Sequence, residues 1–278
     1  MSDVGIVTLI LILANFIFSY GGFLERQLFD KYKFEVDGIL MYKEYVRLLG
    51  SGFLHVGWLH LGFNMFSLYA FSWMPEFLFG YWQFALIYFA SLIGGNLLAL
   101  FIHRHHGDYS AVGASGAVSG VIFAAIAIFP SMGIHPFGIP ISMPAWLYGI
   151  IFILFSIYGI KSARDNIGHE AHLGGALVGM LVAIALEPRL LTHNYVPILG
   201  ILLPCLLFIF LIATRPHLLL IDTAYGKGRD NHYNLEHRYN AQKTTRQKEL
   251  DKLLDKIRRK GINSLTAKER QQLDEYSK

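Results

Sequence analysis

The sequence predicts an all-α membrane protein, and three observations support this prediction. Of the 278 residues, 54% are hydrophobic and 16% are charged, whereas soluble domains carry about 25% charged residues. The long apolar runs lie within residues 1–218, and most of the charge lies within residues 219–278. Seven apolar segments have about the length that a membrane-spanning helix needs, roughly 17–25 residues. We therefore expect a membrane-embedded body followed by a soluble tail.

The seven segments are separated by polar or proline-containing connections. Four prolines lie at or between the fourth and fifth segments, where a ring that lacks a backbone donor favours a loop. The first connection, residues 21–53, mixes charged and aromatic side chains and is expected to lie at the membrane interface. The N-terminal segment is expected to be a retained membrane helix, because it lacks the basic start and the cleavage pattern of a signal peptide. The predicted spans are residues 4–20, 54–74, 81–102, 113–130, 144–160, 169–187 and 196–214.

The tail is expected to form two short helices. Apolar residues at helical spacing indicate a first helix that ends at Gly261. Thr266 and Glu269 have the spacing of a capping box and indicate the start of a second helix. The apolar positions of the two helices are Leu250, Leu253, Leu254, Ile257, Leu273 and Tyr276.

Polar side chains in the second span require an explanation, because they are costly inside a membrane. His60 and Asn64 are four residues apart, so they lie on one face of the helix. Both can donate hydrogen bonds, and two donors that point to one place would stabilise an oxyanion. The alternative is that they satisfy each other or a neighbouring carbonyl, and this segment alone favours that alternative.

Serine and glycine recur on faces of the fourth span. Gly116 and Gly120 are four residues apart, as are Ser115 and Ser119, and small residues allow close approach of another helix. A serine at a helix N-terminus lies among unpaired backbone N–H groups at the positive end of the dipole, which favours an alkoxide. Simple packing of small residues is the alternative, and this segment alone favours it.

The sixth span carries His172, Gly175 and Gly179 on one face. The glycines would bring this helix against the small residues of the fourth helix and place His172 near Ser115. A neutral imidazole within hydrogen-bonding reach of a serine is the minimum arrangement that activates the nucleophile. The alternative is a histidine bonded to a carbonyl of another helix. Since Asp165 lies in a loop, we expect a Ser–His dyad without a third member.

The remaining features indicate no cofactor. The loop of residues 103–109 is rich in histidine, but its residues have no regular metal-ligand spacing, so no metal is expected. The net charge of +4 comes largely from the tail and does not indicate a nucleic-acid partner. The single cysteine, Cys205, excludes an intramolecular disulfide.

These residues resemble the rhomboid intramembrane serine proteases over about residues 50–190. Gly113-Ala114-Ser115-Gly116 is similar to the family's GxSG nucleophile motif. His60 to Asn64 is similar to its HxxxN oxyanion motif, and Ala171 to Gly179 to its AHxxGxxxG base motif. The segments Ser51–His55 and Glu76–Gly80 also resemble the family. Three separate motifs, in order on the second, fourth and sixth helices, make the resemblance specific.

The resemblance implies a fold and a reaction. The fold is a six-helix rhomboid core, residues 1–190, followed by a seventh transmembrane helix within residues 191–218 and a basic soluble helical tail, residues 219–278. Ser115 would attack the scissile carbonyl and His172 would take its proton. His60, Asn64 and the backbone N–H groups of Ser115 and Ala114 would hold the oxyanion. The substrates would be single-pass or polytopic membrane proteins in the lipid bilayer, most simply of the cell's inner membrane.

Two positions depart from the family pattern. Ser119 stands where the family often has an aromatic residue that stacks on the base, and Val46-Arg47 stands where it often has Trp-Arg. The orientation also stays open, because the charge distribution places the tail and the active face in the cytoplasm, whereas the family resemblance implies the opposite.

Two other functions fit parts of the pattern. A non-catalytic rhomboid-like protein would bind client helices, although such a protein is expected to lack Ser115 or His172. A transporter or channel would use the membrane histidines as a metal or proton path and would tolerate loss of Ser115.

Overall fold

The computed structural model describes residues 5–135, 142–162 and 167–214, together with a few positions of the tail: Leu253, Lys256, Ile257, Ser264, Leu265, Thr266 and Glu269. The chain divides into two compact units, Met1–Gly226 and Lys227–Lys278. The finer division at residues 190 and 218 stays a prediction.

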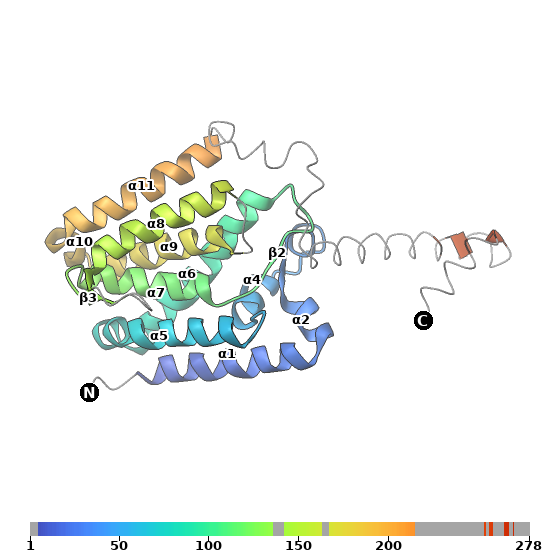
Figure 1. The fold of residues 1–278 in the computed structure, drawn as a ribbon, viewed down its shortest axis with the longest axis horizontal. Coiled ribbons are helices and arrows are strands. Elements are labelled where there is room, and N and C mark those ends of the chain that lie inside the picture. Colours follow the sequence, from blue (N-terminus) through green and yellow to red (C-terminus); the bar gives the residue numbers. More distant parts are fainter. Residues whose placement is uncertain are drawn as a thin grey trace. The chain divides into compact units, whose positions relative to one another are not determined.

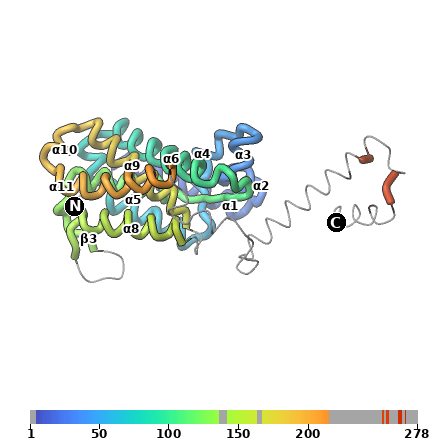
Figure 2. Tube along the Cα trace, turned by 90° about the horizontal axis from the view of Figure 1, so that it is seen from above, coloured from blue at the N-terminus to red at the C-terminus, as the bar shows by residue number. Residues whose placement is uncertain are grey.

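Long helices that lie side by side dominate the larger unit, and their axes stay roughly parallel in two views (Figure 1 and Figure 2). Each predicted segment overlaps one of them. They are α1 (Ile6–Leu24), α5 (Trp58–Phe79), α6 (Tyr81–His103), α7 (Ser115–Ile128), α8 (Ala145–Ser162), α9 (His169–Leu186) and α11 (Tyr195–Thr214).

Five of the described helices, α1, α6, α8, α9 and α11, are long and apolar enough to cross a membrane. The α5 helix has 22 residues but carries polar side chains along its length and is not among the five. The α7 helix is apolar but has 14 residues, a length of about 21 Å, which is shorter than a hydrocarbon core of about 30 Å. Seven membrane crossings therefore remain a prediction.

The α7 helix lies in the interior of the bundle. Twelve of its fourteen residues are buried, and α9 makes its most extensive contacts with α7 and α6. A helix that is apolar on every side is expected in such a place. The short α7 is therefore surrounded by protein, and its N-terminal residue, Ser115, is placed by the neighbouring helices.

The second predicted span differs most from the observed helix. We expected residues 54–74, but α5 begins at Trp58 and continues through Pro75 to Phe79. Pro75 removes one backbone hydrogen bond without ending the helix. The helix ends at Gly80, whose φ of +81° is a conformation that glycine adopts readily.

The first connection is a folded segment at one end of the bundle. It contains α2 (Arg26–Tyr32), β1 (Phe34–Glu35), α3 (Val36–Leu40), α4 (Arg47–Gly50) and the 3₁₀ turn Ser51–Phe53. The two residues of β1 pair antiparallel with β2 (Ser110–Ala111), which precedes α7. At the opposite end lie α10 (Arg189–His193) and the pair formed by β3 (Gly133–Ile134) and β4 (Met143–Pro144) (Figure 1).

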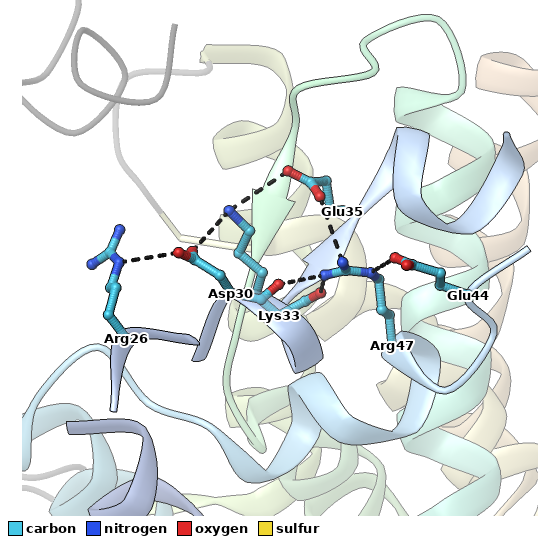
Figure 3. A network of polar contacts seen from close by, with 6 residues as sticks. All are labelled: Arg26, Asp30, Lys33, Glu35, Glu44 and Arg47. Carbon is cyan, nitrogen blue, oxygen red and sulfur yellow. Dashed lines mark hydrogen bonds and ion pairs between the residues drawn. The ribbon is translucent and has the colours of Figure 1, made fainter. Parts of the chain in front are cut away.

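Arg47 holds this first connection together (Figure 3). Its Nη1 donates to the backbone carbonyl of Asp30 at 2.8 Å and to that of Lys33 at 2.9 Å. Its Nε donates to the Glu44 carboxylate, and its Nη2 lies 3.9 Å from Glu35. The planar guanidinium of arginine provides several donors in fixed directions, which suits this set of acceptors. One side chain therefore joins α2, β1 and α4.

Glu76 of α5 caps the N-terminus of α1. Its carboxylate accepts the backbone N–H groups of Val7 at 2.8 Å and Thr8 at 3.1 Å, and the Thr8 hydroxyl at 2.6 Å. The first N–H groups of a helix lack intrahelical partners and favour an anion. A Cβ on Gly5 would overlap this carboxylate. The contact therefore fixes α1 against α5.

In the tail, the predicted capping box is confirmed. The backbone N–H and the hydroxyl of Thr266 donate to Glu269 Oε2 at 2.7 and 3.0 Å, and the backbone N–H of Glu269 donates to Thr266 Oγ1 at 3.3 Å. Lys256 Nζ also donates to Glu269 at 2.6 Å. The other residues on which the predicted tail helices rest lie outside the described residues: Leu250, Leu254, Gly261, Leu273 and Tyr276. Asp165, in the loop before α9, also lies outside them.

Candidate active site

Three helices begin at the same end of the bundle and carry the predicted site residues in their first turns. His60 is the third residue of α5, Ser115 is the first of α7, and His172 is the fourth of α9. Because each side chain lies near the start of its helix, the packing of the helices decides whether the groups meet.

Gly113 brings His60 close to Ser115. A Cβ on Gly113 would lie 2.8 Å from His60 Cε1 and 3.6 Å from Ser115 Oγ. Gly113 also has a φ of +137°, a conformation that other residues rarely adopt. The glycine of the predicted nucleophile motif therefore allows the imidazole to approach the serine.

Glycine contacts bring α7 and α9 together at the level of Ser115 and His172. A Cβ on Gly116 would lie 3.2 Å from the carbonyl oxygen of Ala171, so the neighbour of Ser115 contacts the neighbour of His172. One turn further along α9, a Cβ on Gly175 would overlap the carbonyl oxygen of Gly116. The same holds at the next turn for Gly179 and Gly120. The two backbones are therefore as close as small residues allow.

The two predicted oxyanion residues lie together on α5. Asn64 is buried, and its Nδ2 donates to the backbone carbonyl of His60 at 2.9 Å. An amide nitrogen has two hydrogens, so this bond leaves one donor of Asn64. Within the described part of the chain, His60 Nδ1 is buried without a hydrogen-bond partner.

His55 holds the peptide that precedes the nucleophile, a role that the sequence did not reveal. Its Nε2 accepts the backbone N–H of Ala114 at 3.4 Å, and its Nδ1 lies 2.8 Å from Ser19 Oγ. Ser19 Oγ in turn donates to the Phe53 carbonyl at 2.9 Å. One proton arrangement satisfies all three bonds: a neutral imidazole protonated on Nδ1. The Ala114 N–H, which we expected to face the oxyanion, therefore has a partner in this structure.

An aromatic ring lies near the base histidine, although Ser119 does not provide it. The Phe152 ring of α8 lies 6.0 Å from the His172 ring between centroids, at 39° between the planes. Ser119 Oγ instead donates to the carbonyl of Ser115 at 2.7 Å. Phe152 could not be singled out from the sequence, because it is one of many apolar residues in its helix.

Metal ligands are not gathered in this region. In residues 5–135, 142–162 and 167–214 and the described tail positions, no three His, Cys, Asp or Glu side chains come together as a metal site. The chemistry available to the site is that of a hydroxyl, imidazoles, an amide and backbone N–H groups.

Family comparison agrees with the arrangement of these helices. Residues 42–189 match the model of the Rhomboid domain. Residues 233–278 match a family of unknown function (DUF6576). Because the Rhomboid match covers more than half of the chain, the chain belongs to the rhomboid family and is an integral membrane protein.

Several curated proteins are similar to this chain. Rhomboid protein 1, mitochondrial, of Saccharomyces cerevisiae is 31% identical over 150 residues, which cover 51% of this chain and 43% of that protein. Rhomboid protease GluP of Bacillus subtilis is 33% identical over 146 residues, 51% of this chain and 26% of that protein. Rhomboid protease AarA of Providencia stuartii is 30% identical over 193 residues, 61% of this chain and 67% of that protein. The chain thus spans less than half the length of the first two relatives.

Proposed function

We propose that this chain is an intramembrane serine endopeptidase that hydrolyses peptide bonds in or near transmembrane segments of membrane proteins. The observation that supports this proposal best is the close contact between Gly116 and Ala171. Gly116 follows Ser115 and Ala171 precedes His172, and Gly113 lies close to both the His60 ring and the Ser115 hydroxyl, so these contacts support a meeting of the three side chains. Two of the relatives named above are rhomboid proteases by name.

The proposed reaction uses the dyad. Ser115 Oγ attacks the scissile carbonyl while His172 takes the serine proton, and His172 returns this proton to the leaving amine. Water then hydrolyses the acyl-enzyme with His172 as the base. No cofactor takes part.

The oxyanion is held by the backbone N–H of Ser115, by His60 and by the second N–H of Asn64. The N–H of Ala114 joins these donors only after it leaves His55. In soluble serine proteases, loss of one such donor costs about 2.7–4 kcal/mol of transition-state stabilisation.

The substrates are single-pass or polytopic membrane proteins that reach the site from the lipid bilayer, and no nucleic acid is involved. We place the protein in the cell's inner membrane. Relatives in yeast and in Arabidopsis thaliana are named as mitochondrial, which makes the choice of membrane a point to test by fractionation of the native host.

The decisive experiment replaces Ser115 with alanine. The full chain, reconstituted in liposomes with a model transmembrane substrate, is expected to cleave it. Ser115→Ala and His172→Ala should each lower kcat on the order of a million-fold, as in subtilisin. A fluorophosphonate probe should label the wild-type protein at Ser115.

A matched control is available in α8. Ser162 donates to the Gly159 carbonyl at 3.3 Å and is not among the proposed site residues, so Ser162→Ala should cleave normally. Unchanged cleavage by Ser115→Ala would discard the proposal, and a wild-type protein that does not cleave would leave the non-catalytic or transport functions.

A further inference from the structure

A buried polar cluster lies beside the proposed dyad and has no role in the reaction described above. His103, the last residue of α6, places its Nε2 3.0 Å from Oε1 of Glu170, the second residue of α9. The His103 ring also stacks on the Tyr109 ring, with centroids 3.6 Å apart and planes at 8°. The Tyr109 hydroxyl lies 3.5 Å from the other oxygen of Glu170.

The three residues belong to segments that carry the proposed nucleophile and base. Tyr109 precedes β2 in the segment that leads into Ser115, and Glu170 precedes His172 by two positions. The backbone carbonyl of Tyr109 accepts the N–H of Val36 at 3.2 Å, so this segment is also held by the first connection. The cluster therefore joins three parts of the chain: the segment that leads into Ser115, the end of α6 and the first turn of α9, which carries His172.

Burial makes this arrangement costly without compensation. His103 is 3% exposed and Glu170 is 7% exposed. A buried carboxylate needs a partner and hydrogen bonds to offset the loss of water. Glu170 has both, and its place in the first turn of α9 also favours an anion. Apolar side chains would fill the same space but would form no directional hydrogen bond. The bond between His103 and Glu170 fixes the relative position of α6 and the start of α9.

We propose that Glu170, held by His103 and Tyr109, is a positioning residue that sets the first turn of α9 relative to Ser115. This inference rests on the proposed protease function. Glu170 does not touch the reacting atoms. It acts through the backbone of α9 and sets the direction of the His172 imidazole. This direction determines how often the dyad is in its reactive geometry.

The test compares variants of the full chain in liposomes. Glu170→Gln keeps the size of the side chain but weakens the bond to His103. We expect kcat to fall up to about 100-fold, the loss that a displacement of about 1 Å can cause, with KM within about twofold. The labelling rate of Ser115 by a fluorophosphonate probe should fall with kcat, since labelling does not depend on binding of the protein substrate.

A pair of variants at His103 separates positioning from general packing. The Nε2 of glutamine can occupy the place of the histidine Nε2, so His103→Gln should retain most of the wild-type kcat. His103→Leu fills the space without a donor and should lose kcat as Glu170→Gln does. The double variant His103→Leu with Glu170→Gln should lose little more than either single variant, because both remove the same interaction.

The matched control is Glu187→Gln, just beyond the other end of α9, where the Glu187 side chain is half-exposed, lies 4.0 Å from Arg189 Nε and accepts the Arg189 backbone N–H at 3.3 Å. It should cleave as the wild-type protein does. Equal kcat in Glu170→Gln, His103→Leu and the wild type would overturn the inference, as would a loss in His103→Gln equal to that in His103→Leu. A wild-type protein that neither cleaves nor is labelled would instead refute the protease function itself.

Discussion

Gly175 of α9 lies so close to Gly116 of α7 that a Cβ on Gly175 would overlap the Gly116 carbonyl oxygen. Since the obstacle is backbone and not the end of a flexible side chain, neither helix can make room without moving. The separation of the two helices, on which the proposed contact between Ser115 and His172 depends, is therefore set here.

Replacement of Gly175 by alanine should push the two helices apart. Overpacking of this kind costs about 1–3 kcal/mol of folding free energy. The loss of activity should be larger than this loss of stability explains, because the dyad is also displaced. Thermal unfolding in detergent and cleavage in liposomes measure the two effects. Gly200→Ala in α11 is the matched control, because a Cβ there meets nothing within 4 Å. A fully active Gly175→Ala variant would contradict the importance of this contact.

Loss of the Glu76 carboxylate should detach the start of α1. Glu76→Gln replaces one of the two oxygens that accept the N–H groups of Val7 and Thr8 with a donor and removes the charge, and hydrogen bonds to charged groups contribute about 1.5–3 kcal/mol each. We expect a lower midpoint of thermal unfolding and faster hydrogen exchange in the first turn of α1. Thr8→Val, which removes one of the bonds, should have a smaller effect. Protection of α1 that stays at the wild-type level in Glu76→Gln would argue against the cap.

The arrangement around Arg47 predicts that lysine cannot replace it. An ammonium group has donors but not the planar fork, in which Nη1 reaches the carbonyls of Asp30 and Lys33 while Nε reaches the Glu44 carboxylate. Arg47→Lys should therefore destabilise the first connection by about 1–3 kcal/mol, seen as increased hydrogen exchange in residues 26–53. Arg26→Lys is the control, because Arg26 is more exposed and its guanidinium contacts Asp30 at 3.5 Å and the Phe29 ring but no backbone carbonyl in the described contacts. Equal exchange in the two variants would show that the guanidinium geometry is unimportant.

The tail contains a carboxyl group whose titration can be followed. The hydrogen bond from Lys256, and then those from Thr266, lower the pKa of the Glu269 carboxyl to about 2, from an ordinary value of about 4.3. Because the pKa in the folded tail lies below that in the unfolded chain, this group stabilises the fold above pH ~4.3 and loses that effect as the pH falls toward 2. Carboxyl ¹³C NMR of the full chain should show this low pKa.

Lys256→Gln tests the main cause of the shift. The pKa of Glu269 should rise toward its ordinary value in this variant, and Thr266→Val should raise it less. If Lys256→Gln left the pKa of Glu269 near 2, the contact with Lys256 would not be its main cause.

The helices were predictable from the sequence because a membrane requires long apolar segments. Such a segment consists of consecutive residues, so it can be recognised without knowledge of distant contacts. The start of α9 at His169 and the capping box of Thr266 and Glu269 are local patterns of the same kind. The ends of α5 were predicted less well. The continuation past Pro75 leads to the contact of Glu76 with α1, whose first residues are 68 or more positions away in the sequence.

The sequence by itself indicated the candidate dyad, the oxyanion pair and the glycines between the helices. Local spacing puts His60 and Asn64 on one face of their helix and His172 with the glycines on one face of another, and it puts Ser115 at a helix start. Only the tertiary structure decided what surrounds them. His55 meets Ala114 across 59 positions and His103 meets Glu170 across 67. Such contacts depend on how several helices pack at once, and no periodicity within one segment records which distant side chain will satisfy a buried polar group.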